Sequence, residues 1–274
     1  MVGKPVAHSL SPVLHTAAYE ALGLTGWTYS RLEASESELP ALVASLDESW
    51  AGLSVTMPGK RAALALASSA TARAVAVGAA NTLVRAGSGW TADCTDVDGV
   101  VGALRAVGFT SGDRGVVLGA GGTACAALAG LAELGLSSAT VVVRDPARAA
   151  DAVRCGSAVG LSVSVTPWAS APFAALASDA DVLVNTTPPE AISSCVPALA
   201  RAGCVLDVIY HPWPTPLAAA AGGRLATGLD MLLHQAFGQV EQFTGRPAPR
   251  AAMRSALRAA TGGILPLPLA ATDG

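Results

Sequence analysis

Short runs of branched apolar residues alternate along the chain with longer segments that are rich in alanine and leucine. The apolar runs have the length of strands, and the segments between them have the length of helices. Strands that alternate with helices are typical of α/β proteins with mostly parallel sheets. We therefore predict an α/β fold with strands at residues 53–56, 81–85, 116–118, 140–143, 181–185 and 204–209.

Capping signals support the predicted helices. Ser11 precedes Pro12, and Asp145 precedes Pro146. A Ser or Asp side chain satisfies free amides at a helix start, and proline suits the first helical position. We therefore expect each pair to begin a helix, with Ser11 as the cap of the first one, which should stop at Gly23.

Two changes of pattern predict that the chain crosses between domains twice. The first change lies near residue 97, ahead of a glycine-rich run, and the second lies near Gly228. A length of 274 residues is enough for two domains. We therefore expect residues 1–97 and 229–274 to form one domain and residues 98–228 to form the other.

The composition narrows the class of protein. Hydrophobic residues make up 51% of the chain and charged residues 14%, which is enough apolar surface for a folded core. A net charge of −3 provides no basic face for nucleic acid. The uncharged run at 115–132 is rich in glycine and alanine, so it predicts a strand, a turn and a packed helix rather than a membrane span. With no signal peptide evident, we expect a cytoplasmic protein that binds neither nucleic acid nor a membrane.

Cysteine and histidine spacing argues against a metal site. The five cysteines contain no C-x-x-C pair, and their odd number argues against a disulfide framework. The four histidines lack metal-ligand spacing to one another. We therefore expect no metal ion and a reducing compartment.

The predicted strand at 116–118 is followed at once by a glycine turn and an alanine-rich helix. This is the G-x-G-x-x-A pattern in the strand, turn and helix context of dinucleotide-binding proteins. The first glycine permits a tight turn, the second lets the backbone approach a pyrophosphate, and the helix start offers free N–H groups. An ordinary glycine turn is the alternative. We predict a Rossmann-type, doubly wound domain that holds its cofactor at Gly119, Ala120, Gly121, Gly122 and Thr123.

The end of the next predicted strand should choose between NAD and NADP. Asp145 could hold the ribose 2′-hydroxyl of NAD, whereas Arg144 and Arg148 could converge on the 2′-phosphate of NADP. Because Asp145 precedes Pro146, it is also well placed to cap a helix. We therefore favour NADP, with a solvated arginine pair as the alternative.

Several short polar motifs follow one another outside the predicted nucleotide domain. In order they are G-x-P-x-x-H-S-x-S-P at 3–12, V-T-x-P-x-K at 55–60, N-T at 81–82, T-D at 95–96 and G-x-x-M-L-x-x-Q at 228–235. With the glycine turn, this series resembles the shikimate dehydrogenase family from end to end. The resemblance implies an N-terminal α/β substrate domain and an NADP-binding domain. It also implies reversible NADP-dependent reduction of 3-dehydroshikimate to shikimate, in the biosynthesis of chorismate and the aromatic amino acids.

The resemblance implies a reaction centre at Lys60 and Asp96, which match the catalytic lysine of the family and its partner aspartate. Hydride transfer at a carbinol carbon needs a proton to cross to the oxygen, which a positioned acid–base group supplies. The chain contains two lysines, Lys4 and Lys60. A lysine at the motif position is therefore less likely to occur there by chance. A solvated lysine at a helix start is the alternative. Gly228 and Met231 match the wall that faces the nicotinamide.

The resemblance also implies a substrate site made of hydroxyl and amide groups. Ser9 and Ser11 match serines that hold the substrate carboxylate, which suits hydroxyl donors at a helix start. Asn81 and Asp96 match residues that grip ring hydroxyls. Helix capping alone is the alternative for Ser11. The substrate contacts implied together are Ser9, Ser11, Thr56, Asn81, Tyr210 and Gln235.

Some positions depart from the family pattern. Only Met1 and Val2 precede Gly3, so the apolar first strand of the family is missing or shortened. Thr16, Ser54 and Cys94 stand at positions where the family usually has asparagine. In the nucleotide domain, Cys125 occupies the usual arginine site after the glycine turn, and Val143 occupies the usual asparagine site before Arg144. We therefore expect thinner contacts to NADP than is usual.

Two other functions stay open from the sequence. One is a quinate/shikimate or aminoquinate-type dehydrogenase that uses NAD or NADP, which Asp145 and the asparagine replacements allow. The other is a non-catalytic homologue that senses its ligand. In each case we expect a small-molecule partner and a monomer or homodimer.

Overall fold

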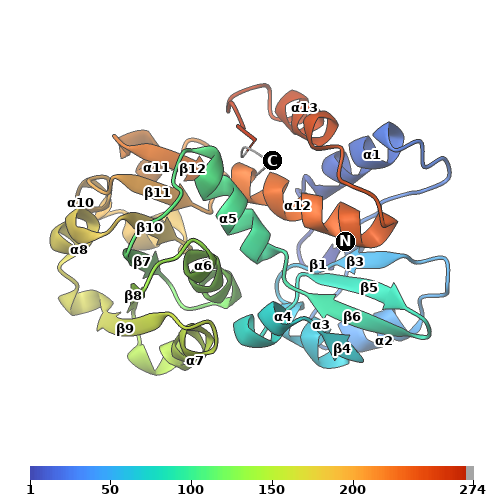
Figure 1. The fold of residues 1–274 in the computed structure, drawn as a ribbon, viewed down its shortest axis with the longest axis horizontal. Helices are drawn as coiled ribbons and strands as arrows, with labels where there is room; N and C mark the ends of the chain where they lie inside the picture. Colours follow the sequence, from blue (N-terminus) through green and yellow to red (C-terminus); the bar gives the residue numbers. More distant parts are fainter. Residues whose placement is uncertain (270–274) are drawn as a thin grey trace. The chain divides into compact units, whose positions relative to one another are not determined.

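The structure is a computed structural model that describes residues 1–269 (Figure 1). The chain forms two compact units: Met1–Thr95 with Leu232–Leu267 make up the first, and Asp96–Met231 with the described residues from Pro268 make up the second. These divisions lie two and three residues from the predicted positions. Pro268 and Leu269 group with the second unit rather than the first, and residues 270–274 of the predicted first domain lie outside the described residues.

The first unit is built on a four-stranded sheet of mixed direction. Its order is β3 (Gly52–Ser54), β5 (Thr82–Ala86), β6 (Gly89–Asp93) and β4 (Ser69–Ala70). β5 runs antiparallel to both β3 and β6, while β4 is parallel to β6. The expectation of mostly parallel strands is therefore wrong for this unit. The two-residue turn at 87–88, with Gly87 at a φ of 57°, joins β5 and β6 as a hairpin, which forces antiparallel pairing.

A two-residue strand stands at the start of the described chain. β1 (Val2–Gly3) spans two residues and pairs in parallel with β2 (Leu32–Glu33). Val2 also bridges to Val55, just beyond the end of β3. The apolar core of the unit includes Val2, Leu53, Leu83 and Trp90, so this short strand is still tied into the core.

Helix α1 (Ser11–Ala21) starts one residue earlier than the capping signal predicts. Leu10 occupies the cap position, and Ser11 is the first helical residue. The hydroxyl of Ser9 accepts the N–H of Ser11 at 3.2 Å. Ser9, rather than Ser11, therefore satisfies a free amide at the start of this helix. The helix ends just before Gly23, whose φ of 65° stops it as predicted. The other helices of the unit are α2 (Leu39–Ala44), α3 (Lys60–Leu66), α4 (Ala72–Val77), α13 (Arg250–Ala260) and most of α12 (Gly228–Thr244).

The second unit contains a six-stranded sheet in which every neighbouring pair is parallel. The spatial order is β12 (Arg224–Thr227), β11 (Cys204–Asp207), β10 (Val182–Asn185), β7 (Arg114–Leu118), β8 (Ser138–Val143) and β9 (Ser162–Pro167). The chain therefore starts at β7, builds one half outward to β9, and then returns to build the other half from β10. This is the doubly wound Rossmann order, so the predicted fold class is confirmed.

Helices cover both faces of this sheet (Figure 1). α5 (Asp96–Ala106) and α6 (Gly122–Glu133) pack against each other on one face, and α7 (Ala150–Ala158) packs beside α6. α8 (Phe173–Asp179), α10 (Val196–Leu199) and α11 (Pro216–Ala220) pack together on the other. Along β7, Val116 and Leu118 belong to one apolar core, which also contains Leu183 and Leu199. Val117 lies between them in the strand, so its side chain is buried on the opposite face of the sheet.

The uncharged run at 115–132 resolves into β7, a turn and α6, as predicted. Across residues 1–269, none of the helices combines the length and apolar character that crossing a bilayer requires.

Candidate active site

The glycine turn adopts the predicted strand, turn and helix geometry. β7 ends at Leu118, Gly119 has a φ of 102°, and Gly121 is the cap residue of α6. A Cβ on Gly119 would lie 2.5 Å from the Thr186 hydroxyl, so a side chain is excluded there by both conformation and space. A Cβ on Gly121 would meet no atom within 4 Å. Free space therefore lies beside Gly121 at the start of α6, where a helix offers N–H groups that suit a pyrophosphate.

The turn lies at the point where the strand order reverses, between β7 and β10. The hydroxyl of Thr186, just after β10, donates to the Leu118 carbonyl at 2.7 Å. The Asn185 side chain accepts the N–H of Thr187 at 3.0 Å and donates to Asp207 at 3.0 Å. Dinucleotides bind at such a switch point in doubly wound sheets. These residues were not predicted from the sequence, although a polar Asn-Thr-Thr run at the end of a predicted strand was a usable signal.

Asp207, at the end of β11, anchors the loop that carries Tyr210. Its carboxylate is fully buried and accepts hydrogen bonds from Asn185 at 3.0 Å and from the Thr215 hydroxyl at 2.6 Å. Burial raises the pKa of Asp207, and these donors oppose that rise. Burial also raises the pKa of the half-buried Tyr210.

Gly228 begins α12 against this same loop. A Cβ at this position would lie 2.1 Å from the Val208 carbonyl oxygen and 2.8 Å from the Tyr210 ring. Glycine was predicted here because it would let the nicotinamide approach the backbone. The structure adds a second reason, because the loop that carries Tyr210 leaves no room for a side chain at this position. Met231 lies in the first turn of α12 and is buried. In that turn, Asp230 accepts the hydroxyl and N–H of Thr227 at 2.6 and 2.8 Å.

Asp145 caps a short helical turn, as predicted. Its carboxylate accepts the N–H of Ala147 at 3.0 Å at the start of η1 (Pro146–Ala149), which leads into α7. Arg144 and Arg148, on either side, are both exposed. The capping bond engages Oδ1 of the carboxylate, and Asp145 is exposed together with Arg144 and Arg148 at the end of β8.

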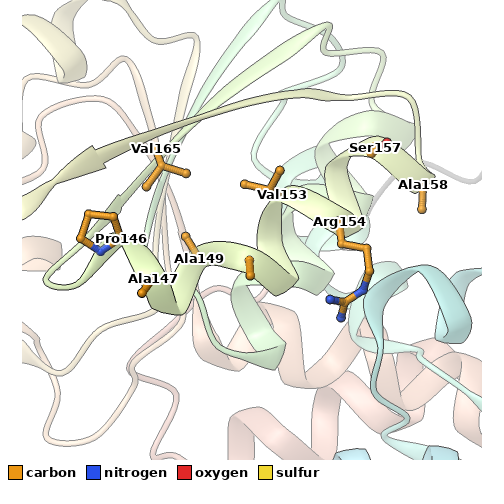
Figure 2. Close-up of a pocket in the computed structure, with 9 residues that line it drawn as sticks. Pro146, Ala147, Ala149, Val153, Arg154, Ser157, Ala158 and Val165 are labelled. Atoms are coloured by element: carbon orange, nitrogen blue, oxygen red, sulfur yellow. The ribbon is translucent and has the colours of Figure 1, made fainter.

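An open hollow of about 670 Å³ lies elsewhere in this unit, between η1, α7 and β9. Figure 2 shows Val153 of α7 and Val165 of β9 directed toward one another across it, with Pro146 beside them. No predicted site residue lines this hollow. The hollow therefore does not coincide with the predicted cofactor residues at the glycine turn.

In the first unit, Ser9 and Ser11 lie together at the start of α1. Their hydroxyls are 3.2 Å apart, with Ser9 as the donor. The Arg31 guanidinium donates to the Ser9 carbonyl at 2.7 Å, which adds positive charge next to the pair. Hydroxyl donors, a helix start and a guanidinium form a suitable environment for a carboxylate.

Lys60 is the first residue of α3 and is partly exposed. Its carbonyl accepts the N–H of Ala80 at 2.9 Å, and the carbonyl of Asn81 accepts the N–H of Val55 at 2.7 Å. These bonds bring the Thr56–Lys60 loop and Asn81 to the same end of the sheet. Thr56 itself is held by a 2.9 Å bond from its N–H to the Val2 carbonyl.

Asn81 and Gln235 are in direct contact, although the sequence separates them by 154 residues. The Asn81 amide donates to the Gln235 side-chain oxygen at 3.2 Å, and both side chains are buried. The Asn81 oxygen accepts the N–H of Thr95 at 2.8 Å. Asp96 comes next, buried at the start of α5. The first unit thus brings Asn81 and Gln235 together, whereas Asp96, Tyr210, Gly228 and Met231 belong to the second unit with the glycine turn.

A doubly wound sheet with a glycine turn at its switch point, joined to an α/β unit with a lysine and hydroxyl and amide groups, defines a dinucleotide-dependent oxidoreductase of two units. Residues 1–83 match the shikimate dehydrogenase substrate binding domain, and residues 228–258 match the shikimate 5′-dehydrogenase C-terminal domain. The chain is 40% identical over 268 residues to a protein named shikimate dehydrogenase (NADP(+)) from Methylobacterium radiotolerans, covering 91% of this chain and 92% of that one. The chain belongs to the shikimate dehydrogenase family.

Solved structures agree over nearly the whole length. Shikimate dehydrogenase of Mycobacterium tuberculosis is 54% identical, with a TM-score of 0.89, and the match covers 94% of this chain and 97% of that one. Shikimate 5-dehydrogenase of Thermus thermophilus, solved with NADP(H) and shikimate, is 31% identical with a TM-score of 0.79 and coverages of 94% and 97%. Quinate dehydrogenase of Corynebacterium glutamicum, solved with NAD, is 29% identical with a TM-score of 0.83 and the same coverages.

Proposed function

We propose that this protein is an NADP-dependent shikimate dehydrogenase, an oxidoreductase that reversibly reduces 3-dehydroshikimate to shikimate in chorismate and aromatic amino-acid biosynthesis. Relatives that carry this name cover more than nine-tenths of the chain, and one solved relative holds NADP(H) and shikimate. The observation that carries the proposal is the contact between the buried side-chain amides of Asn81 and Gln235. Both residues lie in the first unit, which contains the match to the substrate binding domain. Amide pairs of this kind suit a ring with several hydroxyls.

The two units divide the work between substrate and cofactor. The first unit, with residues near 1–97 and beyond 229, binds the substrate, and the second, near 98–228, binds NADP. In the second unit, Gly119 through Thr123 hold the pyrophosphate, which the free space beside Gly121 at the start of α6 supports. Arg144 and Arg148 bind the 2′-phosphate. Gly228 and Met231 form the wall beside the nicotinamide.

When bound, NADP supplies or accepts the hydride. Lys60 then handles the proton at the substrate oxygen: its ammonium group gives the proton during reduction and recovers it during oxidation. Asp96, which matches the partner aspartate of the family, binds a ring hydroxyl. Ser9 and Ser11 fix the substrate carboxylate, and Thr56, Asn81, Tyr210 and Gln235 orient the ring.

Replacement of Lys60 tests the chemistry. Lys60→Ala should lower kcat for shikimate oxidation by about 10²–10⁴-fold with a much smaller change in KM, because the lost interaction belongs to the transition state. Lys4→Ala is the matched control, since Lys4 is the other lysine of the chain and lies on the surface 4.0 Å from Glu38. Equal kcat values for the parent and Lys60→Ala would refute the assignment.

A quinate dehydrogenase is the second candidate, because one similar structure has that function and holds NAD. The ratio of kcat/KM for quinate to that for shikimate separates the two. We further propose that the protein is cytoplasmic and acts as a monomer or homodimer, which fractionation of cells and light scattering of the purified chain would test.

A further inference from the structure

Gln239 is a buried polar side chain with no part in the mechanism above. It is 1% exposed and lies one turn after Gln235 on α12, so both side chains point from the same face of the helix. Its side-chain oxygen accepts the Ser54 hydroxyl at 2.7 Å and lies 3.2 Å from Nε2 of His15. Its amide group donates at 3.1 Å both to the Asn81 carbonyl and to the Thr82 hydroxyl. The hydrogen-bonding groups of Gln239 are therefore fully used.

These contacts set the proton positions around Gln239. Its side-chain oxygen can only accept, so Nε2 of His15 carries the hydrogen in that contact. Burial lowers the pKa of His15 to about 3, against the opposing effect of this hydrogen bond, and keeps the ring neutral at physiological pH. The Ser54 hydroxyl likewise points its hydrogen at Gln239. The oxygen of Gln239 thus fixes the direction of every bond that ends on it.

One branch leads from Gln239 to the serine pair. Tyr29 donates its hydroxyl to Ser54 at 2.6 Å, and its ring stacks on His15 with centroids 4.0 Å apart. Ser11 also acts on the Tyr29 hydroxyl and opposes the rise of its pKa, and Ser9 donates to Ser11 at 3.2 Å. A chain of hydroxyls therefore connects the groups proposed to hold the substrate carboxylate with the oxygen of Gln239.

The other branch leads to the groups proposed to bind the ring. The Thr82 hydroxyl, which accepts from Gln239, donates to the Asn81 side-chain oxygen at 2.9 Å. The Asn81 amide is thereby oriented with its nitrogen toward Gln235, to which it donates. The orientation of this amide decides which substrate groups it can recognise.

We propose that Gln239 is a positioning residue that holds the carboxylate side and the ring side of the substrate site in one arrangement, with Tyr29 and Ser54 as its connection to the serine pair. The inference rests on the proposed function. Gln239 touches neither substrate nor cofactor in this account and acts through Ser54, Asn81 and their partners.

The Gln239→Met variant tests the proposal, because methionine keeps the volume of the side chain and removes its hydrogen bonds. Contacts that hold the substrate equally in the ground state and the transition state affect KM rather than kcat. We expect KM for shikimate to rise about tenfold, while kcat and KM for NADP+ stay within about twofold of the parent.

Gln242→Met is the matched control on the same helix. The Gln242 amide donates to the Asp93 carboxylate at 2.6 Å, in a cluster with no proposed substrate contact. The same chemical change is made there, so the control should lower thermal stability without changing KM for shikimate. A rise in KM for shikimate in Gln239→Met alone would therefore separate positioning from a general loss of stability.

Tyr29→Phe provides a second variant if Gln239→Met does not fold, since it removes one hydroxyl and keeps the stacked ring. It should also raise KM for shikimate selectively. In the double variant the two increases should combine to less than their product, because both act through Ser54. Values of KM for shikimate within twofold of the parent, in Tyr29→Phe and in any folded Gln239→Met, would overturn the inference. A parent chain that does not oxidise shikimate would instead refute the proposed function.

Discussion

The hydroxyl of Thr186 donates to the carbonyl of Leu118 and occupies the space that a side chain on Gly119 would need. This contact ties the ends of β7 and β10 together at the switch point of the sheet. The glycine turn thus depends on a residue 67 positions later in the sequence, and Gly119 and Gly121 differ in what surrounds them.

The two glycines should therefore respond differently to alanine. Gly119→Ala should lower the free energy of unfolding by roughly 1–3 kcal/mol, because the residue has a φ of 102° and its Cβ would lie 2.5 Å from Thr186. Gly121→Ala should leave the unfolding free energy nearly unchanged, since no atom lies within 4 Å of that Cβ, yet raise KM for NADP+. Denaturant unfolding and initial rates on both variants check this, and equal losses of stability would contradict it.

Arg144→Ala and Arg148→Ala should each raise KM for NADP+ by about tenfold or more while leaving kcat/KM for NAD+ unchanged, because only NADP+ carries the 2′-phosphate. Arg154→Ala is the control in the same unit, since Arg154 forms an exposed ion pair with Asp151 at 2.9 Å. Equal decreases in kcat/KM with NADP+ and with NAD+ would mean that the arginines do not bind the 2′-phosphate.

Asp93 should be a main source of stability in the first unit. Its buried carboxylate forms paired bonds with the Arg73 guanidinium at 2.7 and 2.5 Å and accepts from Thr71 at 2.6 Å. Asp93→Asn should lower the unfolding free energy by roughly 3 kcal/mol at neutral pH, because it breaks a largely buried ion pair. Denaturant unfolding measures this, and a change below about 1 kcal/mol would place the pair with ordinary surface ion pairs.

The same carboxyl gives a pH dependence of known sign. Burial opposes ionisation of Asp93, but Arg73, Thr71 and Gln242 outweigh it and hold its pKa below the ordinary value. The stability it contributes is therefore present above the unfolded-state pKa of about 4 and is lost as the pH falls through the lower folded-state pKa. The free energy of unfolding should therefore fall more in the parent than in Asp93→Asn as the pH is lowered from about 5 to about 3.

His15 should produce a second pH dependence at higher pH. Burial lowers its pKa to about 3 from an ordinary value of 6.5, so the unfolded chain binds the proton first. The stability that neutral His15 contributes is complete above the ordinary pKa and falls by about 1.4 kcal/mol per pH unit below it. The unfolding free energy should therefore decline more steeply between about pH 6 and 5 in the parent than in His15→Asn. Equal slopes would show that His15 is protonated in the folded chain.

Four strands of the parallel sheet, β7, β8, β10 and β11, were predicted because each contains a continuous apolar run, and the glycine turn follows β7 directly. The other two, β9 and β12, were missed because polar residues interrupt their apolar positions. The capping role of Asp145 was also predictable, since the proline that follows fixes where the helical turn begins. The hairpin between β5 and β6 was missed, because strands on either side of a two-residue turn show no alternation with helices.

The candidate site was predictable only where a local motif marked it. Lys60, Asn81 and Gln235 each lie in a short motif. Gln239 carries no such mark: its bond to Ser54 joins residues 185 positions apart, and nothing in either local sequence indicates it. Polar residues that act through long-range contacts become visible only once the fold brings them together.

The most direct test of the central claim is the rate of NADPH formation with shikimate and NADP+, measured beside quinate and NAD+ in all four combinations. We expect the highest kcat/KM for shikimate with NADP+, since the two amides suit the shikimate ring and the exposed arginines suit the 2′-phosphate. A preference for quinate or for NAD+, or no turnover by a folded protein with any pair, would contradict the account.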